Sequence, residues 1–180
     1  MLLDRDKSCL LVIDVQEKLI GAMSAAAEVV ANTGILLKAA ERLDIPALFS
    51  EQYPKGLGPT VPELAPYAAK AGAVTKTAFS CAAAPGYLER LKAVGRDQLV
   101  LTGIEAHVCV LQTALELKDR GFPVFVVADA ISSRKPENAE IAISRMREAG
   151  VTVVTTEMVL FEWLGRAGTP EFKELSALIR

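Results

Sequence analysis

The stretch TGIEAHVCVLQTALEL, residues 102–117, decides how the rest of the sequence is interpreted. It begins as the end of an apolar strand, breaks at Gly103, and continues with the apolar spacing of an amphipathic helix. The helix pattern begins close to Cys109, and the only histidine of the chain, His107, lies two residues earlier. Because a helix N-terminus stabilises negative charge, Cys109 is either a nucleophilic thiolate or a small apolar residue on a buried helix face.

Outside this stretch, short apolar runs alternate with amphipathic segments along the chain. Continuously apolar runs are typical of parallel strands covered on both faces, and the strand–helix–strand order gives right-handed crossovers. The pattern predicts an α/β fold: a Rossmann-like, doubly wound parallel sheet of six strands with helices on both faces. The expected strands are 8–14, 46–50, 72–76, 98–104, 123–129 and 151–156, and the expected helices are 24–43, 85–94, 107–120, 136–149 and 157–165.

The composition limits the classes of protein that the chain can represent. Its 180 residues fit a single domain, 1–180, that needs no disulfide or structural metal to fold. A formal net charge of −2 without a basic stripe argues against a nucleic-acid partner. No apolar run reaches the roughly 20 residues of a membrane span, and the first one predicts a strand, not a signal peptide. Three cysteines without paired spacing favour a reducing, cytoplasmic location, and 51% apolar content favours a buried subunit interface.

One segment breaks the alternation of strands and helices. Residues 51–72, EQYPKGLGPTVPELAPYAAKAG, carry four prolines and three glycines, so we expect a long irregular loop. The segment follows a strand, which places it at the carboxyl edge of the sheet, where open α/β folds bind ligands.

Polar residues at the strand ends should converge at that same edge. Asp14 follows the first strand, Glu51 the second and Lys76 the third, while Cys109 lies just past the fourth and Asp129 ends the fifth. A lysine nearby would favour a thiolate, and an aspartate could move the proton between thiol and leaving group. Backbone N–H groups of the turn at 104–109 could stabilise an oxyanion.

Each of these residues also has a structural interpretation. A strand-end Asp14 is often a turn residue, Lys76 could be a solvated surface group, and Cys109 could be a packing residue. Cys9 lies inside the first strand and is predicted to belong to the core. Packing is also the default for Cys81, with a place in the pocket wall as the alternative.

Three segments resemble the signature segments of the isochorismatase-like cysteine hydrolase superfamily, in the same order and at similar separation. They are LLVIDVQ (10–16), VTKTAFS (74–80) and the stretch 102–117, and the resemblance extends from Ser8 to about Gly165. It is closest to the isochorismatase domain-containing branch, a name that does not itself imply isochorismatase activity. The resemblance implies a Rossmann-like sheet and an Asp–Lys–Cys triad.

Carried over by position, the resemblance makes Asp14 the general acid and base, Lys76 the residue that orients it and stabilises the thiolate, and Cys109 the nucleophile. It also implies a cis peptide bond between Ile104 and Glu105, with the N–H groups of Glu105 and Cys109 directed at the oxyanion. The residues expected to line or support the pocket are Gln16, Leu19, Tyr53, Phe79 and His107. For His107, a base role and a structural role at the pocket edge both remain open, and neighbours two apart on a helix do not face each other.

The sequence departs from the nicotinamidases of this superfamily. Those enzymes hold a metal with an aspartate and two histidines after the second strand, whereas SEQYPKGLGP (50–59) contains no histidine. We therefore expect no catalytic metal and no cofactor. Leu19 also stands where an aromatic residue is common in nicotinamidases and many amidohydrolases.

Other functional classes lack their characteristic residues. A receiver domain or haloacid-dehalogenase-type phosphatase needs a second acid near Asp14, and Gln16 stands where the phosphatase would have it. No glycine-rich phosphate loop follows a strand, which argues against a nucleotide-binding protein. The sequence predicts a cysteine hydrolase of a small amide or related acyl compound, working through a covalent acyl-enzyme on Cys109 as a homo-oligomer. The alternative is a catalytically inactive scaffold or binding protein with the same fold.

Overall fold

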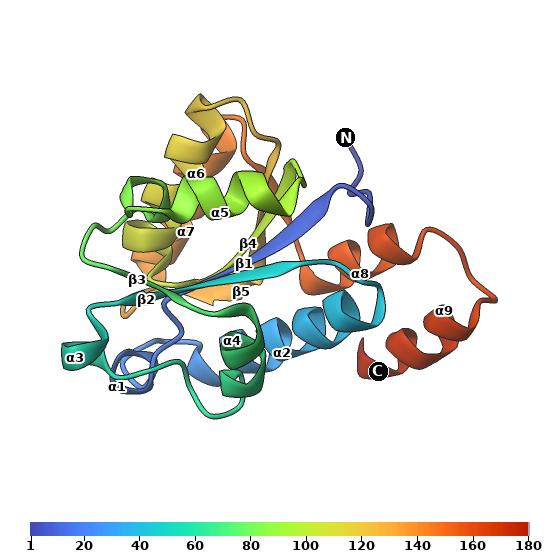
Figure 1. The fold of residues 1–180 in the computed structure, drawn as a ribbon, viewed down its shortest axis with the longest axis horizontal. Helices are drawn as coiled ribbons and strands as arrows, with labels where there is room; N and C mark the ends of the chain where they lie inside the picture. The colour runs from blue at the N-terminus through green and yellow to red at the C-terminus, as the bar shows by residue number, and fades with distance from the viewer. Residues whose placement is uncertain (180) are drawn as a thin grey trace.

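The computed structural model describes residues 1–179. Its centre is a six-stranded sheet, entirely parallel, in the order β3-β2-β1-β4-β5-β6 (Figure 1). The chain builds outward from β1 to β3, returns to the centre, and builds outward again from β4 to β6. The predicted doubly wound α/β fold is therefore confirmed. The strands are β1 (Ser8–Ile13), β2 (Ala47–Gln52), β3 (Val74–Lys76), β4 (Gln98–Ile104), β5 (Val124–Ser132) and β6 (Thr152–Val154).

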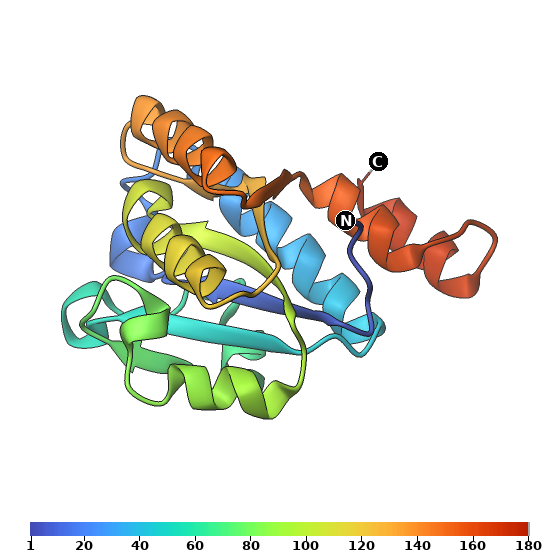
Figure 2. The ribbon, with the colours of Figure 1, turned by 90° about the horizontal axis from the view of Figure 1, so that it is seen from above.

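Helices cover both faces of the sheet. One face carries α2, α4 and α8, with α9 packed on α8, and the other carries α5, α6 and α7 (Figure 1). Seen from above, α8 and α9 extend beyond the sheet on the side of the N-terminus (Figure 2). The helices are α2 (Ala26–Arg42), α4 (Ala65–Ala71), α5 (Tyr87–Val94), α6 (Leu111–Asp119), α7 (Pro136–Glu148), α8 (Thr156–Leu164) and α9 (Pro170–Leu175).

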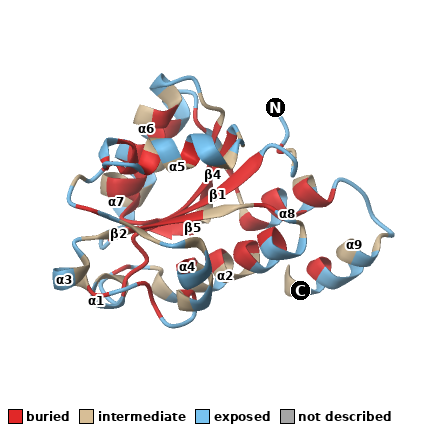
Figure 3. Cartoon of the chain, in the orientation of Figure 1, coloured by how far each residue is buried: buried red, intermediate tan, exposed pale blue. Residues whose placement is uncertain are grey.

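Strand β1 is apolar at successive positions because both of its faces are covered. Successive side chains point to opposite faces, so Cys9 and Leu11 join the core under α5–α7, while Leu10 and Val12 join the core over α2. Every residue of β1 is buried, as are most of the neighbouring central strands (Figure 3). A strand covered on both sides needs apolar residues at every position.

The prediction of an irregular loop over 51–72 is wrong in part. The segment contains two short helices, α3 (Pro54–Leu57) and α4, and a further short helix, α1 (Glu17–Ile20), lies beside α3. Both α3 and α4 have a proline in their first turn, where the missing N–H costs no helical hydrogen bond. The prolines therefore mark helix starts here.

Strand β5 and the helix after β4 also differ from the predictions. β5 continues to Ser132, past the predicted end at residue 129, because its pairing with β4 shifts register between Leu101 and Gly103. The helix predicted over 107–120 begins as a π-helix, Ala106–Val110, and only then becomes α6.

Gly103 joins the two halves of the sheet. Its φ is +121°, and a Cβ added there would overlap with the backbone carbonyl of Ile13. Only glycine allows β4 to approach β1 this closely at the carboxyl end of the strands.

Candidate active site

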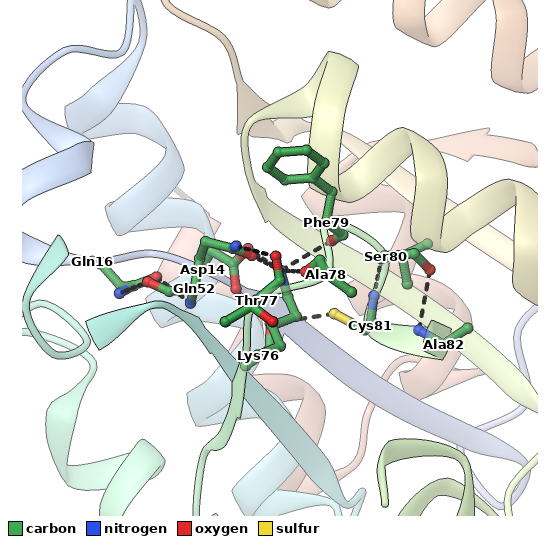
Figure 4. A network of polar contacts seen from close by, with 12 residues as sticks. Asp14, Gln16, Gln52, Lys76, Thr77, Ala78, Phe79, Ser80, Cys81 and Ala82 are labelled. Atoms are coloured by element: carbon green, nitrogen blue, oxygen red, sulfur yellow. Dashed lines mark hydrogen bonds and ion pairs between the residues drawn. The ribbon is translucent and has the colours of Figure 1, made fainter. Parts of the chain in front are cut away.

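Asp14 and Lys76 lie together at the carboxyl ends of β1 and β3 (Figure 4), at the edge of the sheet where the strand order reverses. Asp14 directly follows β1, and its φ of +54° is in the left-handed region, which aspartate tolerates better than most residues. Its N–H donates to the carbonyl of Ser50 in β2 at 3.1 Å. The backbone turn thereby directs a fully buried carboxylate toward β2 and β3.

Asp14 and Lys76 form a buried ion pair. The Nζ of Lys76 lies 2.6 Å from Oδ2 of Asp14, and neither side chain is exposed to solvent. The ammonium also donates to Oε1 of Gln52 at 2.6 Å and to the carbonyl of Phe79 at 3.0 Å. Burial opposes the charge of Lys76, but Asp14 outweighs it and the pKa of Lys76 lies above its usual value. Lys76 is therefore a permanently charged group fixed against Asp14.

The second carboxylate oxygen of Asp14 has a different donor. Its Oδ1 accepts a hydrogen bond of 2.8 Å from Oγ of Ser50. Each oxygen of the carboxylate thus has its own donor, Ser50 on β2 and Lys76 on β3. Two attachment points fix both the position and the plane of the group.

Cys109 lies in the π-helix that precedes α6, and only 6% of the residue is exposed. Burial raises the pKa of its thiol to about 12, aided by the charge of Asp14, while Lys76 lowers it. Lys76 therefore acts on the thiol in the expected direction, but burial and Asp14 act against the thiolate.

The turn between β4 and Cys109 is held from several sides. The peptide bond between Ile104 and Glu105 is cis. The carbonyl of Glu105 accepts the N–H groups of Val108 and Val110 at 3.1 and 3.2 Å. Its carboxylate accepts Nε of Arg134 at 3.0 Å. Glu105 itself is nearly buried, so the turn is anchored to the segment after β5 as well as to its own helix.

Gln16 lies beside the site but bonds to backbone instead of to the Asp14 carboxylate. Its Nε2 donates to the carbonyls of Gln52 and Gly58 at 2.9 and 2.7 Å, and its Oε1 accepts the N–H of Gln52 at 2.7 Å. Gln52 also accepts a hydrogen bond from Lys76. Gln16 therefore supports the ion pair indirectly, by holding the backbone of Gln52.

Three apolar residues expected in the pocket wall have different surroundings. Leu19 is half-buried and packs against the core cluster on the α2 face, whereas Cys109 belongs to the opposite cluster. Tyr53 and Phe79 follow β2 and β3 and are 55% and 54% exposed. The ring of Phe79 points away from the Asp14–Lys76 pair (Figure 4). Both aromatic residues therefore lie largely at the surface near the ends of β2 and β3.

His107 is engaged through both ring nitrogens. Its Nδ1 lies 2.8 Å from Oγ of Ser133, and its Nε2 lies 3.4 Å from Nδ2 of Asn138. These partners connect the π-helix that carries Cys109 to the end of β5 and the start of α7. The contacts support a structural role for His107 over a base role.

The sequence interpretation missed Ser50 and Gln52, and it chose Glu51 instead. Side chains alternate along a strand, so Ser50 and Gln52 share one side of β2, while the Glu51 carboxylate accepts the N–H and hydroxyl of Thr60 at 2.7 and 2.8 Å. A polar residue ending an apolar strand next to Asp14 was the available signal for Ser50. Asp129 likewise lies away from the site and bonds to the start of α8.

The large cavity of the protein is not at this site. A groove of about 910 Å³ lies between α2 and α4 and is mostly apolar. Among residues 1–179, no group of three or more His, Cys, Asp or Glu side chains is placed to hold a metal ion. None of the helices in that range has the length and apolar character to cross a membrane.

A doubly wound parallel sheet with a buried acid, cation and thiol at its switch point is typical of isochorismatase-like hydrolases. Residues 8–158 match the isochorismatase domain, and the chain belongs to this family. Isochorismatase domain-containing protein 2 of Xenopus laevis is 43% identical over 173 residues, covering 96% of this chain and 83% of the relative.

Two solved structures are similar over nearly the whole chain. One is described as a MAR1 ribonuclease from Caenorhabditis elegans, with a TM-score of 0.89 and 38% identity, covering 99% of this chain and 92% of that one. The other is the YcaC gene product of Escherichia coli, described as an octameric hydrolase of unknown specificity. Its TM-score is 0.92 at 25% identity, covering 99% of this chain and 90% of that one. The family and fold are therefore those of hydrolases.

Proposed function

We propose that the protein is a cysteine hydrolase of a small amide or related acyl compound, with Cys109 as nucleophile, Asp14 as general acid and base, and Lys76 as the group that orients Asp14. The observation that carries this proposal is the buried ion pair of Asp14 and Lys76, 2.6 Å apart, which lies close enough to the buried Cys109 thiol for both charges to shift its pKa. A nucleophile beside a base that a third group orients is the arrangement of covalent hydrolases.

The first half of the reaction forms an acyl-enzyme. The Cys109 sulfur attacks the substrate carbonyl carbon while its proton passes to Asp14, and the carbonyl electron pair moves onto the oxygen. The backbone N–H groups of Glu105 and Cys109 are the proposed donors to this oxyanion. When the tetrahedral intermediate collapses, the C–N bond breaks and Asp14 returns the proton to the leaving amine, which leaves a thioester on Cys109.

The second half releases the acid. Asp14 takes a proton from water as the water oxygen attacks the thioester carbonyl, and the departing sulfur of Cys109 recovers that proton. The sum is amide plus water giving acid plus amine, with no redox change. Lys76 stays charged because its pKa is raised, so it holds Asp14 in place between steps.

The surroundings of the triad favour a small substrate. Asp14 and Lys76 have no exposed side-chain surface and only 6% of Cys109 is exposed, which leaves little room beside the thiol and favours a small acyl group. We propose Tyr53 and Phe79 as the rim of the pocket, with Gln16, Leu19 and His107 supporting it. Exposed aromatic residues are common in subunit interfaces, and the Escherichia coli neighbour is described as an octamer. We therefore propose a homo-oligomer, which light scattering would test.

The experiment is trapping of the acyl-enzyme. The protein is mixed with p-nitrophenyl acetate, nitrophenolate release is followed, and the modified peptide is located by mass spectrometry. We expect one acetyl group on Cys109, loss of the burst in Cys109→Ala, and a normal burst in Cys9→Ala. Acetylation elsewhere, or an unchanged burst in Cys109→Ala, would refute the nucleophile. Simple aliphatic amides are then screened for turnover.

An RNA-cleavage assay, combined with the acylation experiment, distinguishes two other functions. RNA cleavage is worth testing because the Caenorhabditis elegans neighbour is described as a ribonuclease. Lys76 is committed to Asp14 and Gln52, which argues against its use as a phosphate-binding cation. Cleavage of single-stranded RNA that survives Cys109→Ala would favour a different site. A protein that neither acylates nor cleaves RNA would be a scaffold or binding protein.

A further inference from the structure

Ser50 connects the Asp14 carboxylate to a further buried hydrogen-bond partner. Its hydroxyl carries one proton, and this proton is used on Oδ1 of Asp14 at 2.8 Å. The Ser50 oxygen must therefore act as an acceptor toward any other partner. Its other partner is Cys81, whose sulfur lies 3.3 Å from Oγ of Ser50. All three residues are almost fully buried, so water does not compete for these bonds.

Cys81 is itself fixed by the helix that carries the nucleophile. Its N–H donates to Oγ1 of the buried Thr113 at 2.9 Å. Thr113 follows Cys109 by four residues along the same helical segment, one turn later. One helix thus sets the positions of both thiols. Figure 4 shows the sulfur of Cys81 directed from its short helical turn toward the residues around Lys76.

The two thiols have different roles in the proposed scheme. Burial raises the pKa of Cys81, so its thiol is protonated and can act as a donor. Cys81 donates to Ser50, and Ser50 donates to Asp14, so Cys81 reaches the carboxylate only through Ser50. The proposed proton transfer from Cys109 to Asp14 does not pass through Cys81.

We propose that Cys81 and Ser50 form a hydrogen-bonded relay, Cys81 to Ser50 to Asp14, that holds the Asp14 carboxylate in the orientation in which it accepts the proton of Cys109. The inference rests on the proposed function and deepens it. Ser50 and Cys81 are positioning residues in this scheme, because neither touches the substrate.

The relay is needed because a single ion pair does not fix a carboxylate. The last torsion of an aspartate side chain is broad, so a carboxylate held only through Oδ2 by Lys76 can turn about that bond. Ser50 removes this freedom by holding Oδ1. A hydroxyl also rotates freely, and the Cys81 thiol, by occupying one lone pair of Ser50, leaves the O–H directed at Asp14.

The first test is an infrared measurement that needs no substrate. Thiol S–H stretching bands lie in a region free of other protein absorption, and donation of a hydrogen bond lowers their frequency. The Cys81 band is assigned by its loss in Cys81→Ala. In Ser50→Ala the band should move to higher frequency, because the thiol has lost its acceptor.

The second test measures the consequence for Cys109. The rate of Cys109 alkylation by iodoacetamide is followed at neutral pH by peptide mass spectrometry. We expect Ser50→Ala to slow it about tenfold, the effect of losing one hydrogen bond to a charged group, and Cys81→Ala to slow it less, because its lost bond is to a neutral hydroxyl. Cys81→Ser should restore the rate, because serine keeps a donor. Cys9→Ala is the matched control, since Cys9 is equally buried and packs in the same core cluster as Cys81.

The outcomes are distinct. A Cys81 band that does not move in Ser50→Ala overturns the relay, as does an unchanged alkylation rate in both Ser50→Ala and Cys81→Ala. Equal slowing in Cys9→Ala and Cys81→Ala overturns it too, because the effect would then be lost packing. Failure of the proposed hydrolase function appears elsewhere, as the absence of an acyl-enzyme on Cys109, while the infrared and alkylation results still decide the relay.

Discussion

The two halves of the sheet each carry an aspartate toward the carboxyl edge, and their surroundings differ. Asp14, after β1, meets a cation, a hydroxyl and a thiol. Asp129, in β5, accepts the N–H and hydroxyl of Thr156 at 2.8 and 3.0 Å, at the start of α8. The partners of Asp129 are neutral groups at a helix N-terminus, where a carboxylate is stabilising. Position at a strand end is therefore not enough, and titratable partners distinguish the candidate site from a structural contact.

The difference also predicts how each half responds to substitution. Around Asp129 every partner is a neutral donor, so losing one costs a single hydrogen bond. Around Asp14 the loss of Lys76 leaves a charge inside the protein without compensation, which is far more costly.

The largest effect is expected where the two halves meet. Gly103→Ala places a Cβ against the Ile13 carbonyl at a φ that alanine rarely adopts, so strain and overpacking together should lower the free energy of unfolding by about 5 kcal/mol. Urea denaturation measures this. Gly21→Ala is the control, because a Cβ added at Gly21 would have no other atom within 4 Å and the φ there is negative. Similar stability of the two variants would mean that β1 and β4 need not approach so closely.

The next effect compares the aspartates directly. Lys76→Met should lower the free energy of unfolding by about 4 kcal/mol, because it leaves the Asp14 charge buried and unpaired. Asp129→Ala should cost about 1.5 kcal/mol, as expected for lost hydrogen bonds to a charged acceptor. The double variant Asp14→Asn/Lys76→Met should recover part of the loss seen in Lys76→Met. If the double variant is the less stable one, the cost does not come from an unpaired charge.

A smaller effect comes from pH. Burial raises the pKa of Cys9 to about 12, so the folded state keeps a proton that the unfolded state loses near its usual value of 9.0. The stabilisation is complete below that value and is lost as pH rises through the window up to the folded pKa. Between about pH 7.5 and about pH 10 this thiol should contribute a fall of about 1 kcal/mol. Urea titrations of Cys9→Ala should show a correspondingly smaller fall, and an identical fall would contradict burial as the cause.

The smallest effect is expected at an exposed ion pair just after β5. Arg134 pairs with Glu105 at 3.0 Å, but 63% of its side chain is exposed. Arg134→Gln should change the free energy of unfolding by about 0.5 kcal/mol, and added salt should reduce the difference. A loss comparable with that of Lys76→Met would show that the two halves are equally dependent on charge.

The sequence carried enough information for the strands and for the convergence of Asp14, Lys76 and Cys109 at one edge. Apolar runs and strand ends can be recognised locally in the sequence. Because the strands are parallel, their carboxyl ends lie at one edge of the sheet, which brings the strand-end residues together. It did not reveal Ser50 and Gln52, because the side of β2 that faces Lys76 depends on register with its neighbours. The choice of Glu51 was wrong by one residue for that reason.

The protonation state of Cys109 was likewise not predictable from spacing. A lysine and a helix start both favour a thiolate, and those signals are local. Burial of the thiol and the nearby charge of Asp14 raise its pKa and dominate, and both depend on packing between segments far apart in the chain. The π-helix at Ala106–Val110 was missed because its apolar spacing is close to that of an α-helix.

The strand order has a consequence for how the chain is made. β1 is synthesised first, but it lies at the centre of the sheet and pairs with β2 on one side and β4 on the other. During synthesis, one apolar edge of β1 therefore has no native partner until residues 98–104 have left the ribosome. Unpaired strand edges recruit other chains. The nascent first half of this protein is thus the stage at which chaperone binding is most valuable, and the candidate site is completed only after that stage has passed.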